Sequence, residues 1–211
     1  FKNKLINNSI INRYKLKLIN LKTVIRYCLL FALIFGICCL ILFTIKNATF
    51  DSRDFSISGS KALLMGINPY SEYLAGDKQG IFIKAQTPNY AQTLYFIFIP
   101  FALVSNSIAN LIWSLLNISM LIKCSLILRK IFSIESIISL IILFGILITG
   151  YPTIYAVTNG QLSIFTLTCF LMGISIKNKK YKFYQYIIFG MSYLKYSFAP
   201  CLSSLSFLRH G

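Results

Sequence analysis

The sequence predicts an all-α protein: a polytopic bundle of transmembrane helices with one large polar loop outside the membrane. Hydrophobic residues make up 56% of the 211 residues and charged residues only 12%, whereas soluble domains carry about 25% charged residues. The apolar residues cluster in runs whose lengths approach the roughly 20 residues that a helix needs to cross a bilayer. The alternating pattern of barrel strands is absent, and open sheets leave backbone groups unpaired in lipid.

The net charge of +16 comes largely from basic residues in short segments beside the apolar runs. Lysines and arginines precede the first run with no acid among them, and further lysines separate two later runs at 177–182. Such segments stay on the cytoplasmic side and attract anionic headgroups. We therefore expect membrane lipids, and no nucleic acid, as the partners of this charge.

The chain divides into segments that differ in composition. Residues 1–23 are expected to form a basic cytoplasmic N-terminus, and 24–45 the first transmembrane helix, whose apolar stretch is too long for a cleaved signal peptide. Residues 46–92 form an extracytoplasmic loop with an acidic motif. Residues 93–207 hold the remaining membrane helices, near 93–104, 108–128, 134–149, 162–176 and 184–207, and residues 208–211 form a truncated end.

The extracytoplasmic loop is expected to contain a short interfacial helix near residues 58–65. Gly66 would end this helix, and Asn68-Pro69-Tyr70 would follow it as a turn. Four of the five acidic residues of the chain lie in the segment from Asp51 to Asp77. Carboxylates that a membrane protein keeps beside the bilayer are functional candidates.

The loop charges bear on whether residues 93–104 cross the membrane. If every later run crossed, the lysines at 177–182 would lie outside, against the positive-inside rule. A half-helix at 93–104, bracketed by Pro88 and Pro100 and short for a span, removes this conflict. It also brings the acidic loop, Gln161 and Lys195 to the same face of the membrane.

Four stretches follow one another in an order that resembles a known family. The first is Asp54-Phe55 with Lys61-Ala-Leu-Leu-Met-Gly-Ile-Asn-Pro-Tyr70; the others are Pro88 to Pro100, Tyr151-Pro152 with Asn159-Gly160-Gln161, and Leu194-Lys195 to Pro200. Together they are similar to the motifs of glycosyltransferase family 87. The chain departs from the family's pattern at Ser58-Gly59, where an aromatic pair is often found, and in having Pro88 in place of a double proline.

The resemblance implies a membrane mannosyltransferase-like enzyme of the GT-C fold. Such an enzyme moves a sugar, typically mannose, from a polyprenyl-phosphate donor to a lipid or glycan acceptor of the cell envelope, with inversion. The family's enzymes are longer, so we expect this chain to be an N-terminal portion. Its richness in Asn, Ile and Lys indicates an AT-rich genome. The expected location is therefore a bacterial plasma membrane, with the site on the outer face.

The inverting reaction needs a base for the acceptor hydroxyl and a cation for the departing phosphate. Asp54 matches the family's loop aspartate and is the candidate base, with Asp51 as the alternative; either carboxylate could instead cap a helix or be a solvated loop acid. Lys195 is expected inside an apolar helix, where it would contact the phosphate unless it snorkels to the headgroups. The cysteines and the single histidine lack metal-ligand spacing, so neither a metal nor another cofactor is expected.

Further residues are candidates for substrate binding: Gln161 and Asn159 for sugar hydroxyls, Tyr70 for stacking on a sugar, and Arg53 and Lys61 for the donor anion. Each also has a plainer interpretation, because Asn-Gly favours a turn, interfacial tyrosines anchor helices and loop cations are usually solvated. The alternatives to an enzyme are a transporter or channel subunit, or an inactive membrane protein fragment. Only an enzyme should depend on Asp54 while folding normally without it.

Overall fold

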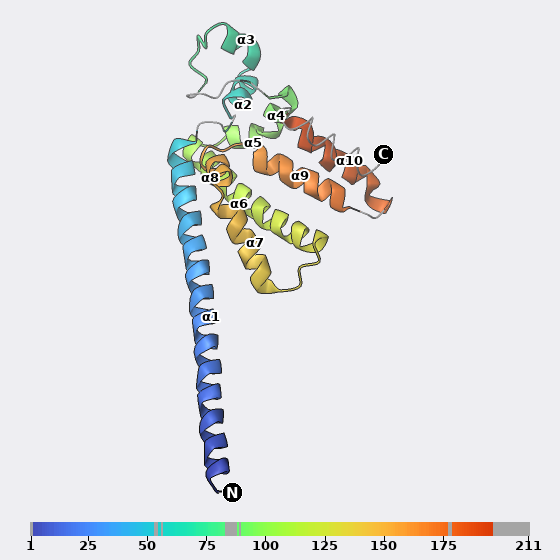
Figure 1. The fold of residues 1–211 in the computed structure, drawn as a ribbon. Coiled ribbons are helices and arrows are strands. Elements are labelled where there is room, and N and C mark those ends of the chain that lie inside the picture. Colours follow the sequence, from blue (N-terminus) through green and yellow to red (C-terminus); the bar gives the residue numbers. More distant parts are fainter. Residues whose placement is uncertain are drawn as a thin grey trace. The chain divides into compact units, whose positions relative to one another are not determined.

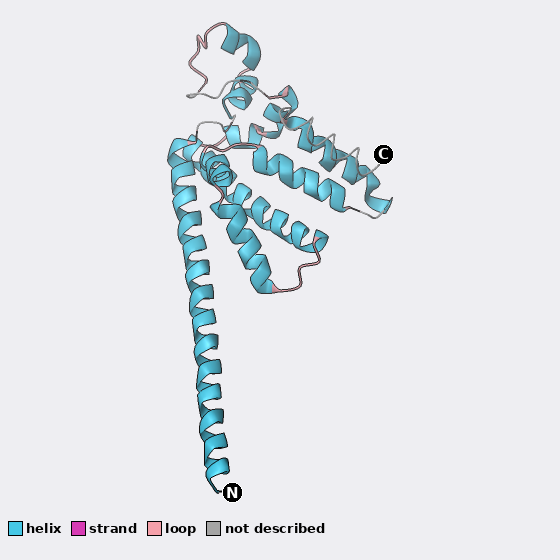
Figure 2. Ribbon diagram, viewed as in Figure 1, coloured by secondary structure: helices cyan, strands magenta, loops and turns pink. Residues whose placement is uncertain are grey.

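The computed structural model describes residues 2–52, 55, 57–82, 88, 90–176 and 179–195. All regular structure in these ranges is helical and none of it is strand (Figures 1 and 2), which confirms the all-α prediction. The chain forms two compact units, residues 1–40 and 41–211. The candidate site lies entirely in the second unit.

Helix α1 (Lys2–Asp51) is longer at both ends than the predicted helix at 24–45. The prediction followed hydropathy alone, but residues 1–23 contain no proline or glycine to interrupt a helix. At the other end, Thr49 Oγ1 donates to the carbonyl of Ile45 at 2.8 Å and the helix continues to Asp51. The loop therefore begins at Ser52 and not at residue 46. The stretch Thr23–Phe50 is long and apolar enough to cross a membrane.

The short loop helix predicted at 58–65 is present as α2 (Ile57–Leu64). Gly66 follows it with a φ of 72°, in the left-handed region where glycine has no steric penalty. The amide of Gly66 donates to the carbonyl of Leu63 at 3.0 Å, so it closes the last turn. The predicted stop at this glycine is thereby confirmed.

The Asn-Pro-Tyr motif, predicted as a turn, instead begins a second short helix, α3 (Pro69–Leu74). Asn68 Oδ1 accepts from the backbone amide of Tyr70 at 3.0 Å, as an N-cap side chain does. Pro69 occupies the first helical turn, where its fixed φ suits a helix and its missing N–H costs nothing. Local chemistry alone explains this motif as a helix start.

Two short helices, α4 (Gln92–Ile97) and α5 (Ile99–Ala102), replace the single half-helix predicted at 93–104. The break falls at Phe98, and Pro100 lacks the N–H that a continuous helix would need. Neither helix approaches the length of a membrane span. This agrees with the expectation that the segment does not cross.

Helix α6 (Asn106–Ile131) matches the span predicted at 108–128 and has the length and hydropathy to cross a membrane. Its exposed face carries large apolar side chains, among them Ile108, Leu115, Ile122 and Leu126. Its buried face mixes apolar side chains, such as Trp113 and Leu121, with the polar residues Asn110, Ser114, Asn117 and Ser125. Apolar residues outside and small polar residues inside are what a helix packed in lipid requires.

Helices α7 (Ile137–Thr149) and α8 (Tyr151–Thr158) meet at Gly150 with a bend of 65°. No helix was predicted between the apolar runs at 134–149 and 162–176, yet α8 occupies most of that interval. Pro152 lies in the first turn of α8, a position that favours helix initiation. The sequence thus restarts a helix immediately after the bend. Counted together, the two helices are long and apolar enough for one broken span or a re-entrant loop.

The last described elements are α9 (Ser163–Ser175), α10 (Lys182–Met191) and two 3-10 turns, η1 (Lys179–Tyr181) and η2 (Ser192–Leu194). Helix α9 lies against both α6 and α10 (Figure 1). With thirteen and ten residues, α9 and α10 are shorter than the predicted spans. The described ranges therefore hold two helices able to cross a membrane, or three if the bent pair forms one span.

An aromatic cluster joins the loop, α5, α6 and the start of α9. The ring of Phe55 stacks on the indole of Trp113 with centroids 5.0 Å apart and planes 5° apart. Phe98 and Phe101 meet the same indole edge-on, at 5.1 and 5.9 Å. Leu162, just before α9, is buried in this cluster. Burial of several aromatic side chains fixes the loop residue Phe55 against α5 and α6.

Candidate functional site

Gly160, between α8 and α9, is the point where the loop after α1 meets the later helices. Its φ is 70°, and a Cβ at this position would lie 2.5 Å from Ser52 Oγ and 2.6 Å from Phe55 Cβ. A side chain would clash there, so only glycine lets the loop approach so closely. The carbonyl of Gly160 accepts a hydrogen bond from Trp113 Nε1 at 2.9 Å. The Gly-Gln element is thereby fixed between the loop and α6.

The structure describes only one of the two predicted catalytic acids, and only in part. Asp54, together with Arg53, lies outside the described residues. Asp51 is the last residue of α1, and its backbone alone is described. Ser52 and Phe55, which flank Arg53 and Asp54 in the sequence, are both buried. These two flanking residues are the ones that pack against Gly160.

Lys195 does not lie inside an apolar helix, as the sequence predicted. It follows η2 with an extended backbone, φ −100° and ψ 91°. Helix α10 ends at Met191 and η2 follows it, and within this turn Ser192 Oγ donates to the carbonyl of Phe189 at 2.6 Å. Lys195 is half-buried, and its Nζ donates to Ser163 Oγ at 2.8 Å. The neighbouring Leu194 packs against the aromatic cluster that contains Phe55.

Gln161 connects Lys195 to the Gly160 element. Its backbone amide donates to the carbonyl of Ala156 at 2.8 Å and closes α8. Ser163 Oγ accepts from Lys195 and lies 3.4 Å from Gln161 Oε1, to which it donates. The three side chains form a polar row at the N-terminus of α9. Ser163 was not predicted; its signal in the sequence is a hydroxyl two residues after the Gly-Gln pair.

Lys61 and Tyr70, both predicted to bind substrate, make their described contacts elsewhere. Lys61 Nζ donates to Asn106 Oδ1 at 2.6 Å and ties α2 to the start of α6. The hydroxyl of Tyr70 donates to the carbonyl of Tyr90, and its ring centroid lies 6.0 Å from that of Tyr95. Burial raises the pKa of Tyr70 above its ordinary value. Both side chains therefore have structural partners.

The small pair Ser58-Gly59 makes room for Tyr95. A Cβ on Gly59 would lie 2.5 Å from an edge carbon of the Tyr95 ring. Ser60 Oγ donates to the carbonyl of Tyr95 at 2.7 Å. The aromatic ring contributed by α4 thus fills the space above α2, and larger residues at 58 and 59 would displace it.

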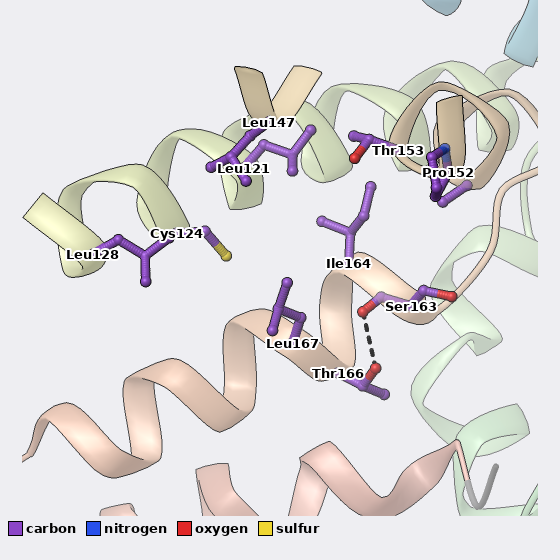
Figure 3. A pocket seen from close by; sticks show the side chains of 11 residues that line it. Leu121, Cys124, Leu128, Leu147, Pro152, Thr153, Ser163, Ile164, Thr166 and Leu167 are labelled. Carbon is purple, nitrogen blue, oxygen red and sulfur yellow. Dashed lines mark hydrogen bonds between the residues drawn. The ribbon is translucent and has the colours of Figure 1, made fainter. Parts of the chain in front are cut away.

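An apolar pocket opens between α6, α7, α8 and α9 (Figure 3). Its volume is about 210 Å³, and Leu121, Cys124, Leu147, Ile164 and Leu167 supply most of its wall. The hydroxyls of Thr153, Ser163 and Thr166 lie among the lining residues, and Thr166 Oγ1 donates to the carbonyl of Ser163 at 3.0 Å. Ser163 is therefore shared between the pocket wall and the polar row with Lys195.

Comparison of the chain with protein-family models, with curated proteins and with solved structures gives no match. The interpretation of the site therefore depends on the residues and their geometry. The structure brings together the loop residues next to Asp54, the Gly160-Gln161 element and Lys195. It gives Lys61 and Tyr70 other neighbours.

Proposed function

We propose that the chain is a membrane glycosyltransferase that moves a sugar, mannose by the family resemblance, from a polyprenyl-phosphate donor to a lipid or glycan acceptor. One observation carries the proposal. Gly160 packs against the residues that flank Asp54, and three residues later Ser163 holds the Lys195 ammonium. Three of the four motifs in the sequence thus converge on one short connection.

The proposed reaction uses these groups in fixed roles. The acceptor hydroxyl loses its proton to the carboxylate of Asp54 while its oxygen attacks the anomeric carbon, and the bond from that carbon to the phosphate oxygen breaks. Partial desolvation beside the bilayer brings a carboxylate pKa toward working pH and improves it as a base. Lys195 stabilises the second negative charge that develops on the leaving phosphate. Gln161 orients the hydroxyls of the transferred sugar.

The surroundings of Lys195 support a donor with an anionic head and an apolar tail. The ammonium and Ser163 form the polar end of the site, and the apolar pocket begins at the same serine. A lipid-linked donor needs this combination, because its phosphate requires a cation while its chain must stay in an apolar environment. The positive charge of residues 1–22 and 177–182 supports an outer-face site in a multi-pass bacterial membrane protein.

The test is transfer of radiolabelled mannose from polyprenyl-phosphate mannose in membranes that contain the chain. Asp54→Asn should abolish transfer at equal expression, and Asp51→Asn should leave most of it. Glu135→Gln, which removes a carboxylate from the exposed connection between α6 and α7, is the matched control and should transfer normally. Transfer by Asp54→Asn with loss in Asp51→Asn would move the base to Asp51. Loss of transfer in none of the three variants would contradict the proposed chemistry.

A further inference from the structure

A second cavity lies between the end of α1 and α8, and no predicted role accounts for it. Its volume is about 520 Å³, within the range of roughly 300–1,000 Å³ that small-molecule sites occupy. The residues that give it its chemistry are Lys46, Asn47, Phe50, Tyr151, Tyr155 and Asn159. The end of α1 is held in place here, since Asn110 Nδ2 of α6 donates to the carbonyl of Thr49 at 3.4 Å.

The lining combines aromatic faces with neutral amides and one cation. The rings of Tyr151 and Tyr155 lie 6.1 Å apart, with their planes inclined by 31°. Phe50 and Tyr151 are each 76% exposed, so their faces are available to a ligand. Asn47 and Asn159 each offer donors and an acceptor, and Lys46 offers donors only. Aromatic faces suit the C–H faces of a sugar ring, and amides suit its hydroxyls.

Helix α8 separates this cavity from the apolar pocket. Residues 151, 154, 155 and 158 line the cavity, whereas 152, 153 and 156 line the apolar pocket. At 100° per residue these two sets occupy opposite faces of one helix. The apolar pocket reaches Ser163 and Lys195, on the side proposed for the donor. The cavity reaches Asn159, which precedes Gly160, and Phe50, which lies two residues before Ser52.

We propose that this cavity binds the saccharide of the acceptor. Because the inference deepens the proposed function, it depends on sugar transfer at the same site. An acceptor held between α1 and α8 would present a hydroxyl next to the loop that carries Asp51 and Asp54. The donor would approach from the other face of α8. Such an arrangement keeps the saccharide of the acceptor and the lipid-linked donor on separate paths to one reaction centre.

Binding of methyl α-mannoside and methyl α-glucoside to the purified chain tests the inference without any transfer step. The measurement is saturation-transfer NMR titration in a detergent that contains no sugar. The wild-type chain should bind at least one of the glycosides with a millimolar dissociation constant. Tyr155→Ala and Asn159→Ala should each weaken binding about tenfold or more, and Tyr155→Phe, which keeps the ring, should retain it. Tyr184→Ala removes a comparably exposed tyrosine from α10 and should bind normally.

The outcomes separate this inference from the proposed function. If neither glycoside binds the wild-type chain, or if Tyr155→Ala and Asn159→Ala bind as tightly as wild type, the saccharide site is refuted even when transfer occurs. If the glycosides bind as predicted but no variant or wild-type chain transfers mannose, the proposed reaction fails, and with it the role of the bound sugar as acceptor.

Discussion

Replacement of Gly160 by alanine is the sharpest structural prediction. Two costs add at this position. A non-glycine residue in the left-handed region costs about 1–2 kcal/mol, and a Cβ placed 2.5 Å from Ser52 Oγ and 2.6 Å from Phe55 Cβ overpacks the contact, which costs about 1–3 kcal/mol. We therefore expect Gly160→Ala to lower the free energy of unfolding by about 2–5 kcal/mol.

Gly66→Ala is the matched control. Gly66 has a φ of 72°, close to that of Gly160, but no atom lies within 4 Å of its Cβ position. This variant should lose only the backbone cost, about 1–2 kcal/mol. Unfolding by sodium dodecyl sulfate in mixed micelles can be followed by the single tryptophan, Trp113, whose indole is bonded to the Gly160 carbonyl. Equal destabilisation by the two substitutions would refute the packing of the loop on Gly160.

Three further predictions concern the supports of the site. Trp113→Phe removes the donor to the buried Gly160 carbonyl, so the free energy of unfolding should fall by about 1–3 kcal/mol in thermal unfolding followed by circular dichroism. An unchanged free energy of unfolding would exclude that bond. Lys61→Met breaks the contact with Asn106 and should cost about 1 kcal/mol, whereas Lys130→Met at the exposed end of α6 should cost little. Burial raises the pKa of Tyr70. The contribution of Tyr70 to the free energy of unfolding is therefore complete below the unfolded pKa near 10 and is lost as pH rises through the folded pKa. Tyr70→Phe should weaken this alkaline loss of stability, and an unchanged pH profile would contradict the prediction.

Local signals were enough to predict several elements. The apolar run at 108–128 gave α6 within three residues at each end, and Gly66 marked the end of α2. Each depends on hydropathy or on the conformational freedom of one residue. The start of α1 was missed because hydropathy does not detect a polar helix, although residues 1–23 contain no helix breaker.

The geometry of the site was harder to predict, because it depends on contacts between residues distant in sequence. Nothing near Phe55 in the sequence indicates that its ring stacks on Trp113, or that both residues contact Gly160. The position of Lys195 was wrong because the apolar run around it is typical of a continuous helix, whereas α10 ends at Met191 and Lys195 follows η2 with an extended backbone. Three of the four motifs in the sequence nevertheless lie in segments that the structure brings together.

The most direct test of the central claim is the initial rate of mannose transfer by Lys195→Met at saturating acceptor, measured beside Lys182→Met. Lys182 lies at the start of α10, where its Nζ is 5.7 Å from the centroid of the Tyr186 ring, and it has no role in the proposed site. Loss of one group that stabilises developing charge lowers catalysis by about 100-fold or more. The account predicts a fall of this size for Lys195→Met and a rate within about twofold of wild type for Lys182→Met. Equal rates in the two variants would contradict the assignment of Lys195 to the leaving phosphate.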